Sequence, residues 1–110
     1  MLLTETISQV RGDSVYQTFE EANNVVFGPQ YWTAMSTIVS RESGFHPTSQ
    51  NSSSGAYGVC QSLPASKMAT FGTDYLTNPV TQINWCLNYV NDRYSNPADA
   101  LYYWDQHNYF

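Results

Sequence analysis

Apolar residues along most of the chain recur at steps of three or four, the spacing that places side chains on one face of an α-helix. The clearest stretch begins at Asn78 and Pro79, a helix-capping residue followed by a residue that suits the first helical turn. The apolar face of this stretch is formed by Val80, Ile83, Leu87, Val90 and Tyr94. We therefore predict that the best-defined helix of the chain begins at Pro79.

The same signals predict four further helices. Gly28 closes the first and Gly44 the second, while Pro64 opens a short third helix. Asn96 and Pro97 repeat the cap and open the last, with Ala100, Leu101 and Trp104 facing inward. The first two helices are expected at 14–27 and 30–43 and the third at 64–72, while residues 1–12 form a lead-in or linker and residues 13–110 the domain.

Residues 45–58 interrupt the helical pattern. No apolar residue occurs from Thr48 through Ser54, and Gly55-Ala56-Tyr57-Gly58 follows. A polar loop of this length is more often functional than a simple connection, and it could contain a small hairpin. No strand shows convincing alternation, so the predicted fold class is mainly α: a single globular domain of about five short helices with one long polar loop.

The composition changes the list of possible ligands. Only 12% of the 110 residues are charged and the net charge is −5, which disfavours nucleic acid because phosphate binding depends on Lys and Arg. The 38 Ser, Thr, Asn and Gln residues, together with many aromatic residues, suit a neutral hydroxyl-rich ligand such as a glycan. A surface of the extracellular or phage type, selected for low charge, explains them equally well.

The sequence has no apolar run long enough to span a membrane, and its first residues lack the pattern of a signal peptide. We expect either a module of a longer secreted or virion protein, or export without a cleaved signal. Cys60 and Cys86 allow one disulfide, and two free buried thiols are the alternative. Two Cys and two scattered His do not form a recognisable metal-binding set, so neither a metal nor another cofactor is expected.

Glu42 is the most informative residue because it continues the apolar stripe of the second helix, formed by Trp32, Met35, Ile38 and Val39. Burial raises the pKa of a carboxyl group, and the negative end of the helix dipole acts in the same direction. Such a group can remain protonated and act as a general acid. The structural alternatives are that Glu42 pairs with Arg41 or Arg93, or that it turns to solvent at a frayed helix end.

Four blocks of sequence, in order, resemble the signature blocks of the soluble lytic transglycosylase (SLT) domain of the lysozyme-like superfamily. They are Glu42-Ser43-Gly44-Phe45-His46-Pro47, Gly55 through Gln61, Asn78-Pro79 followed by Ile83, Leu87 and Tyr89, and Ala100-Leu101-Tyr102-Tyr103. Residues 55–104 look closest to the lysozyme-like domains of aggregation-promoting surface factors and phage tail lysins. The resemblance implies a lysozyme-like fold of the goose-type/SLT kind, with a cleft for peptidoglycan.

The resemblance also implies roles for individual residues. Glu42 matches the catalytic acid and base, while Ser43 and Gln61 match positions that line the cleft. A tyrosine hydroxyl is expected to approach the catalytic Glu, supplied by Tyr102 or Tyr103, and we favour Tyr102. Cys60 departs from the family pattern, and its place beside Gln61, with Cys86 in the next long helix, favours a disulfide behind the cleft floor. Tyr57, between two glycines, either stacks on a sugar or packs within the loop.

Glycosidases ordinarily use two carboxyl groups, yet the matched motifs contain no second acid. Asp74, Asp92, Asp99 and Asp105 are better explained as loop, helix-surface and capping residues. The expected function is cleavage of peptidoglycan glycan strands, as a lytic transglycosylase or a muramidase, at the cell wall or in a phage virion. The alternatives are a non-catalytic wall-binding module and a structural piece of a larger assembly.

Overall fold

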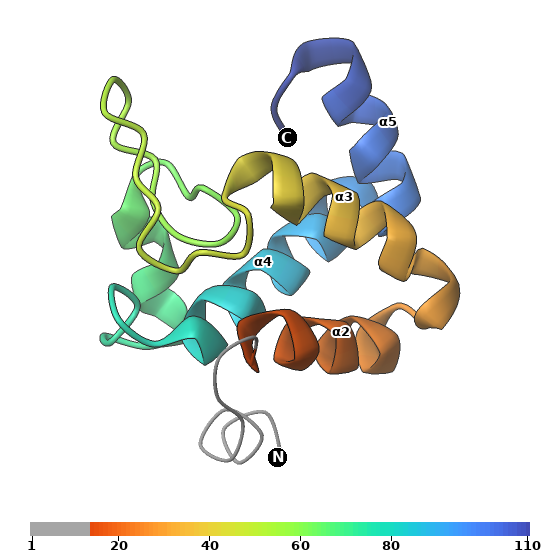
Figure 1. Cartoon of the computed structure of the whole chain (residues 1–110), viewed down its shortest axis with the longest axis horizontal. Coiled ribbons are helices and arrows are strands. Elements are labelled where there is room, and N and C mark those ends of the chain that lie inside the picture. Colours follow the sequence, from red (N-terminus) through yellow and green to blue (C-terminus); the bar gives the residue numbers. More distant parts are fainter. Residues whose placement is uncertain (1–13) are drawn as a thin grey trace.

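The computed structural model describes residues 14–110, so the expected lead-in at residues 1–12 lies outside the described part of the chain. Helices and short 3-10 segments follow one another along this part (Figure 1). In chain order they are α2 (Ser14–Val26), η1 (Pro29–Tyr31), α3 (Trp32–Glu42), η2 (Ala65–Phe71), α4 (Pro79–Tyr94) and α5 (Pro97–His107). The predicted mainly helical, single-domain fold is confirmed.

Helix α4 is the central element, because it contacts α2, η2 and α5. Its first turn is capped as predicted: the Asn78 side chain accepts a hydrogen bond from the Val80 amide, and Pro79 lies at the first position. The helix buries residues on more than one side, namely Val80, Thr81, Gln82, Ile83, Trp85, Cys86, Leu87 and Val90. The chain therefore packs around α4, and residues on its different faces reach different parts of the molecule.

The core joins the predicted apolar stripe of α3 to α2 and α4. Trp32, Met35, Ile38 and Val39 are all buried, together with Phe19 and Ala22 of α2. Four rings, Tyr16, Phe19, Trp32 and Phe45, form an aromatic cluster where α2, α3 and the start of the long loop meet. Burial of this stripe fixes the rotation of α3 and hence the direction of its last residue, Glu42.

Two predicted helices differ in detail from the structure. The stretch expected as one helix at 30–43 begins as the 3-10 turn η1, in which the Tyr31 amide bonds the Gly28 carbonyl three residues back. The short helix expected at 64–72 is also a 3-10 helix, ended by Gly72. Hydrogen bonds between residues three apart are frequent in short connecting segments and at the ends of α-helices.

In the structure the polar loop is the whole connection between α3 and η2, residues 43–64. Hydrogen bonds within this loop order it. Tyr57 forms isolated antiparallel bridges with Gln50 and with Ser62, rather than named strands. The Asn51 side chain accepts hydrogen bonds from the amides of Ser53 and Ser54, which closes the tip of the loop. The loop and η2 form one side of the molecule, and α5 lies on the other (Figure 1). Within residues 14–110, no helix is both long and apolar enough to cross a membrane.

Candidate active site

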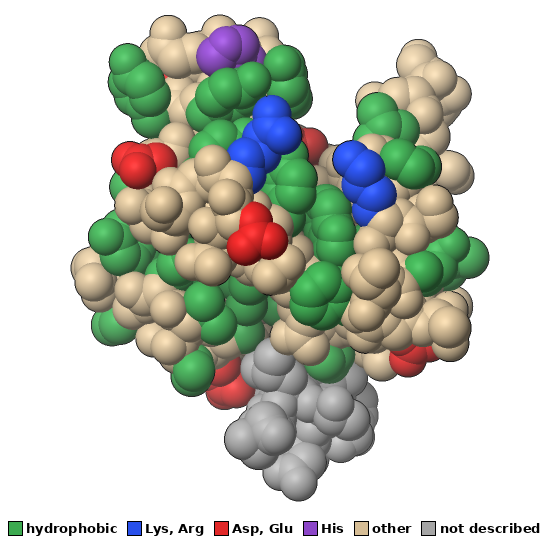
Figure 2. Space-filling model, turned by 180° about the vertical axis from the view of Figure 1, so that it is seen from behind, with side chains coloured by type: hydrophobic (Ala, Val, Ile, Leu, Met, Phe, Trp, Pro, Cys, Tyr) green, Lys and Arg blue, Asp and Glu red, His purple; other side chains and the backbone are tan. Residues whose placement is uncertain are grey.

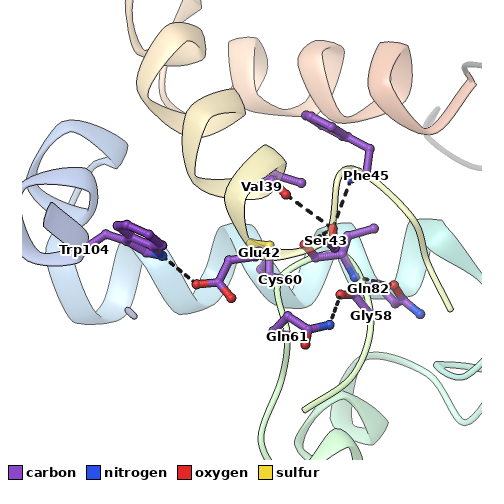
Figure 3. The surroundings of a disulfide bond; sticks show 11 residues. Val39, Glu42, Ser43, Phe45, Gly58, Cys60, Gln61, Gln82 and Trp104 are labelled. Carbon is purple, nitrogen blue, oxygen red and sulfur yellow. Dashed lines mark hydrogen bonds between the residues drawn. A yellow bond between two sulfur atoms is a disulfide. The ribbon is translucent and has the colours of Figure 1, made fainter. Parts of the chain in front are cut away.

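Glu42 is the last residue of α3, and its half-buried carboxyl group points toward α5 (Figure 3). Its Oε2 accepts a hydrogen bond of 2.7 Å from the indole Nε1–H of Trp104. Burial raises the pKa of Glu42 above its ordinary value, and the hydrogen bond from Trp104 opposes part of that rise. Neither pairing considered as the alternative is formed: Arg41 pairs with Asp105 at 2.7 Å, and the Arg93 side chain donates to the Tyr94 hydroxyl.

A pocket of about 440 Å³ opens beside Glu42. One wall comes from the polar loop and η2, and the facing wall comes from α4 and the residues that follow α5. The polar residues in the lining are Asn51, Ser54, Gln61 and Asn108, the charged ones Glu42, Lys67 and Arg93, and the aromatic ones Trp85, Tyr89, Tyr109 and Phe110. Amide groups opposite aromatic rings suit a bound sugar. The faces of the aromatic side chains pack on the sugar ring, and the amide groups exchange hydrogen bonds with the sugar hydroxyls.

Gln61 lines the pocket, as the resemblance implied. Its backbone adopts a positive φ of 55°. The Nε2 group donates to the carbonyls of Ser49 and Gly58, both at 2.9 Å. These two bonds fix the amide plane, so the Oε1 atom is held in a defined position before a ligand arrives.

Ser43 lies next to Glu42 but is not among the pocket-lining residues. Its buried hydroxyl donates to the Val59 carbonyl at 2.6 Å and accepts from the Phe45 amide at 3.1 Å. These bonds tie the end of α3 to the second half of the polar loop. In this structure Ser43 braces the loop that carries Gln61.

Tyr57 is likewise engaged within the fold, and it is not part of the pocket lining. Its hydroxyl donates to the Leu76 carbonyl at 2.7 Å, and its ring packs against the core. Of the two interpretations of this residue, the packing of the loop agrees with its position.

The hydrogen bond that Glu42 accepts comes from Trp104 and not from Tyr102 or Tyr103, the two residues that the resemblance implied. Tyr102 is 69% exposed, and the Tyr103 hydroxyl bonds that of Tyr109. Trp104, one or two residues further along α5, makes the contact to Glu42 instead. The helical rotation of α5 decides which side chain faces α3, and its buried residues Pro97 and Ala100 set that rotation.

Cys60 and Cys86 form a disulfide, with their Cα atoms 6.0 Å apart. Cys60 lies beside Gln61 in the pocket lining, and Cys86 lies on the buried side of α4. The bond therefore anchors the pocket wall formed by the polar loop to the central helix (Figure 3).

No acidic residue other than Glu42 lines the pocket in the described part of the chain. Asp74 accepts hydrogen bonds from Asn78 and Thr81, which lower its pKa and brace the turn before α4. Asp99 lies in the cap of α5, and Asp105 is paired with Arg41. Among residues 14–110, no group of three or more His, Cys, Asp or Glu residues is placed to hold a metal ion.

Two parts of the site were not predicted from the sequence. Gln82, fully buried on α4, accepts from the Val59 amide and donates to the carbonyls of Pro47 and Tyr75, each at 2.9 Å. The residues after α5 form the second part, because Phe110 folds back onto α4 while Tyr109 packs on Tyr103 of α5. For Gln82, the available signal was a glutamine within an apolar helical pattern. No local feature of the sequence indicated the role of the residues after α5.

The family model of the transglycosylase SLT domain matches residues 29–104, more than half of the chain. No curated protein and no solved structure was found to match. The matched span includes Glu42, Gln61, the disulfide and Trp104, and it ends before the aromatic residues Tyr109 and Phe110. With its helical fold and a half-buried glutamate at the end of α3, the chain belongs to the transglycosylase SLT domain family.

Proposed function

We propose that the protein cleaves the β-1,4 bond between N-acetylmuramic acid and N-acetylglucosamine in peptidoglycan, with Glu42 as general acid and base. The observation that carries this proposal is the Glu42 carboxyl group itself: its pKa is raised by burial, and it lines an open pocket with aromatic and amide walls. Membership of the SLT family supports the same activity.

In the first step, the protonated Glu42 carboxyl gives its proton to the glycosidic oxygen while the bond to the anomeric carbon breaks. The raised pKa favours the protonated form that this step requires. Gln61, held by its bonds to the loop, is placed to orient an acetamido or hydroxyl group of the substrate.

In the second step, the Glu42 carboxylate takes a proton from the nucleophile that attacks the anomeric carbon. We favour the C6 hydroxyl of the muramic acid, which closes a 1,6-anhydro ring and makes the reaction a lytic transglycosylation. No second carboxyl group of residues 14–110 lines the pocket to act as a covalent nucleophile. In a muramidase, water would take the place of the C6 hydroxyl.

We also propose that the protein acts outside the cell, at the cell wall or in a phage virion, as a module of a larger surface or virion protein. A disulfide at the site supports an oxidising compartment.

The test is mass spectrometry of the soluble fragments released from purified peptidoglycan. The parent should release fragments with anhydro-muramic ends, and Glu42→Gln should lower the rate by about a hundredfold or more, because it removes the transferable proton. Glu21→Gln is the matched control, since it makes the same chemical change at an exposed residue of α2.

The fragment ends decide the chemistry. Reducing ends from the parent would identify a muramidase and exclude transglycosylation. Equal release by Glu42→Gln would exclude Glu42 as the acid. Absence of release from the parent, with binding retained, would leave a wall-binding module.

A further inference from the structure

Two of the four basic residues of this acidic protein line the pocket. The chain has nine Asp and Glu against four Lys and Arg, yet both Lys67 and Arg93 line the pocket. Lys67 comes from η2 and Arg93 from the last turn of α4, so the two residues belong to different walls. Figure 2 shows two groups of basic side-chain atoms beside the hollow between two lobes of the molecule.

Neither Lys67 nor Arg93 forms an ion pair with an acidic side chain of residues 14–110. In the described part of the chain, the only ion pair joins Arg41 to Asp105, and both of these residues lie outside the pocket lining. Glu42, the single acidic residue in that lining, has a raised pKa that favours its neutral form. The pocket therefore carries local positive charge on a molecule whose net charge is −5.

Arg93 is also held in place. Its Nε–H donates to the Tyr94 hydroxyl at 3.1 Å, and its guanidinium group lies 5.7 to 5.9 Å from the ring centres of Tyr89, Tyr94 and Tyr103. A guanidinium group fixed by aromatic rings loses little side-chain entropy when it binds an anion. Arg93 is therefore oriented by aromatic side chains, and no acidic side chain of residues 14–110 pairs with it.

We propose that Lys67 and Arg93 recognise carboxylate groups of the glycan substrate and so select an anionic amino-sugar polymer over a neutral one. The inference rests on the proposed function and specifies which chemical group of the substrate the site reads. In peptidoglycan the carboxylates belong to the peptide stems and, where a stem has been removed, to the lactyl ether; both are absent from a neutral glucosamine polymer. Local positive charge also offsets the repulsion between the acidic protein and an anionic wall.

The experiment measures binding of two matched probes to the full chain carrying Glu42→Gln, which prevents turnover. One probe is soluble glycan strands with free carboxylates, and the other is the same strands after conversion of the carboxylates to methylamides. We expect the carboxylate form to bind about tenfold more tightly at low salt, with up to about fivefold from each exposed cation. Added salt should weaken only this preference.

The variants separate a specific role from a change of net charge. Lys67→Gln combined with Arg93→Gln should remove the preference, whereas Lys67→Arg should retain most of it. Gln17→Glu, on the exposed side of α2, lowers the net charge by the same amount as Lys67→Gln but should keep the preference.

Equal affinity for the two probes, or a preference that survives replacement of both cations, would overturn the proposal. Fragment release by the parent, measured alongside, distinguishes the two levels of the argument. Fragment release by the parent, together with equal affinities for the two probes, would refute carboxylate recognition but not the proposed function. Absence of both release and binding would refute carboxylate recognition and the proposed function together.

Discussion

At the residue scale, the properties of Glu42 depend on two opposing influences. Burial at the end of an apolar stripe disfavours the carboxylate, while the indole N–H of Trp104 favours it. Burial is the larger influence, so the pKa is raised. A carboxyl group that exchanges its proton within a catalytic cycle needs such a balance, because it must both give and accept a proton.

Trp104→Phe tests this balance. The substitution keeps an aromatic ring but removes the donor to Oε2, so the pKa of Glu42 should rise further. In the proposed mechanism the protonated form is the active acid, so the alkaline limb of the pH profile of kcat/KM should move to higher pH. Tyr102→Phe, at an exposed position of the same helix, should leave that limb in place. A limb that moves to lower pH in Trp104→Phe would contradict the assigned role of the indole.

The same pKa has a consequence for stability. A folded-state pKa above the unfolded value means that the native state binds more protons, so the free energy of unfolding falls as pH rises above about 4.5. Glu42→Gln removes the ionisation and should therefore melt at a higher temperature than the parent near neutral pH. The difference should close below about pH 4, where both side chains are neutral. Thermal melts at the two pH values check this, and a less stable variant at neutral pH would argue against burial as the dominant cause.

At the element scale, α4 holds the polar loop in place through one side chain. The buried amide of Gln82 bonds the backbone at Pro47, Val59 and Tyr75. Gly58 permits this approach, because its φ is +90° and a Cβ atom there would lie 2.7 Å from the Gln82 Oε1. The wall of the pocket that carries Gln61 therefore depends on a glutamine that the sequence analysis did not assign to the site.

Gln82→Ala should destabilise the protein strongly. It removes three hydrogen bonds and leaves buried backbone groups without partners, for an expected loss of about 2–4 kcal/mol in the free energy of unfolding. Chemical denaturation measures the loss. Gln17→Ala replaces an exposed glutamine of α2 and should change stability by no more than about 0.5 kcal/mol. Similar effects of the two substitutions would show that the Gln82 bonds contribute little.

At the scale of the whole molecule, the site is assembled between two sides of the fold. The polar loop and η2 supply Gln61 and Lys67, while α4 and the residues after α5 supply Arg93 and Phe110. The main-chain oxygen of Phe110 accepts hydrogen bonds from the Tyr89 and Tyr94 hydroxyls. These bonds hold the residues after α5 against α4. The disulfide fastens the other wall to the same helix.

Removal of the disulfide should loosen that wall and the whole domain. The bond spans 26 residues of sequence, and closure of a loop of this size contributes about 3 kcal/mol in the chain-entropy model. Cys60→Ala combined with Cys86→Ala should lower the free energy of unfolding by about that amount, as measured by denaturation. Addition of a reductant should produce the same loss of stability in the parent. It should not change the stability of the double variant. An unchanged midpoint in both cases would contradict a stabilising role.

The sequence by itself determined the elements and the central acid of this protein. Capping residues such as Asn78 and Asn96 and the three- and four-residue apolar steps are local signals, so they fixed the positions of most helices. The same periodicity placed Glu42 on the inner side of α3. Four short motifs, in order along the chain, were sufficient to indicate the SLT family, which the family match confirms.

Only the tertiary structure decided which distant side chains meet. Trp104 rather than Tyr102 reaches Glu42 across 62 positions of sequence, because the packing of α5 on α3 sets which face of α5 turns inward. The engagement of Ser43 within the loop and the return of Phe110 to α4 were decided in the same way. Periodicity describes one helix at a time, whereas these contacts depend on the relative rotation of elements that the chain brings together only when it folds.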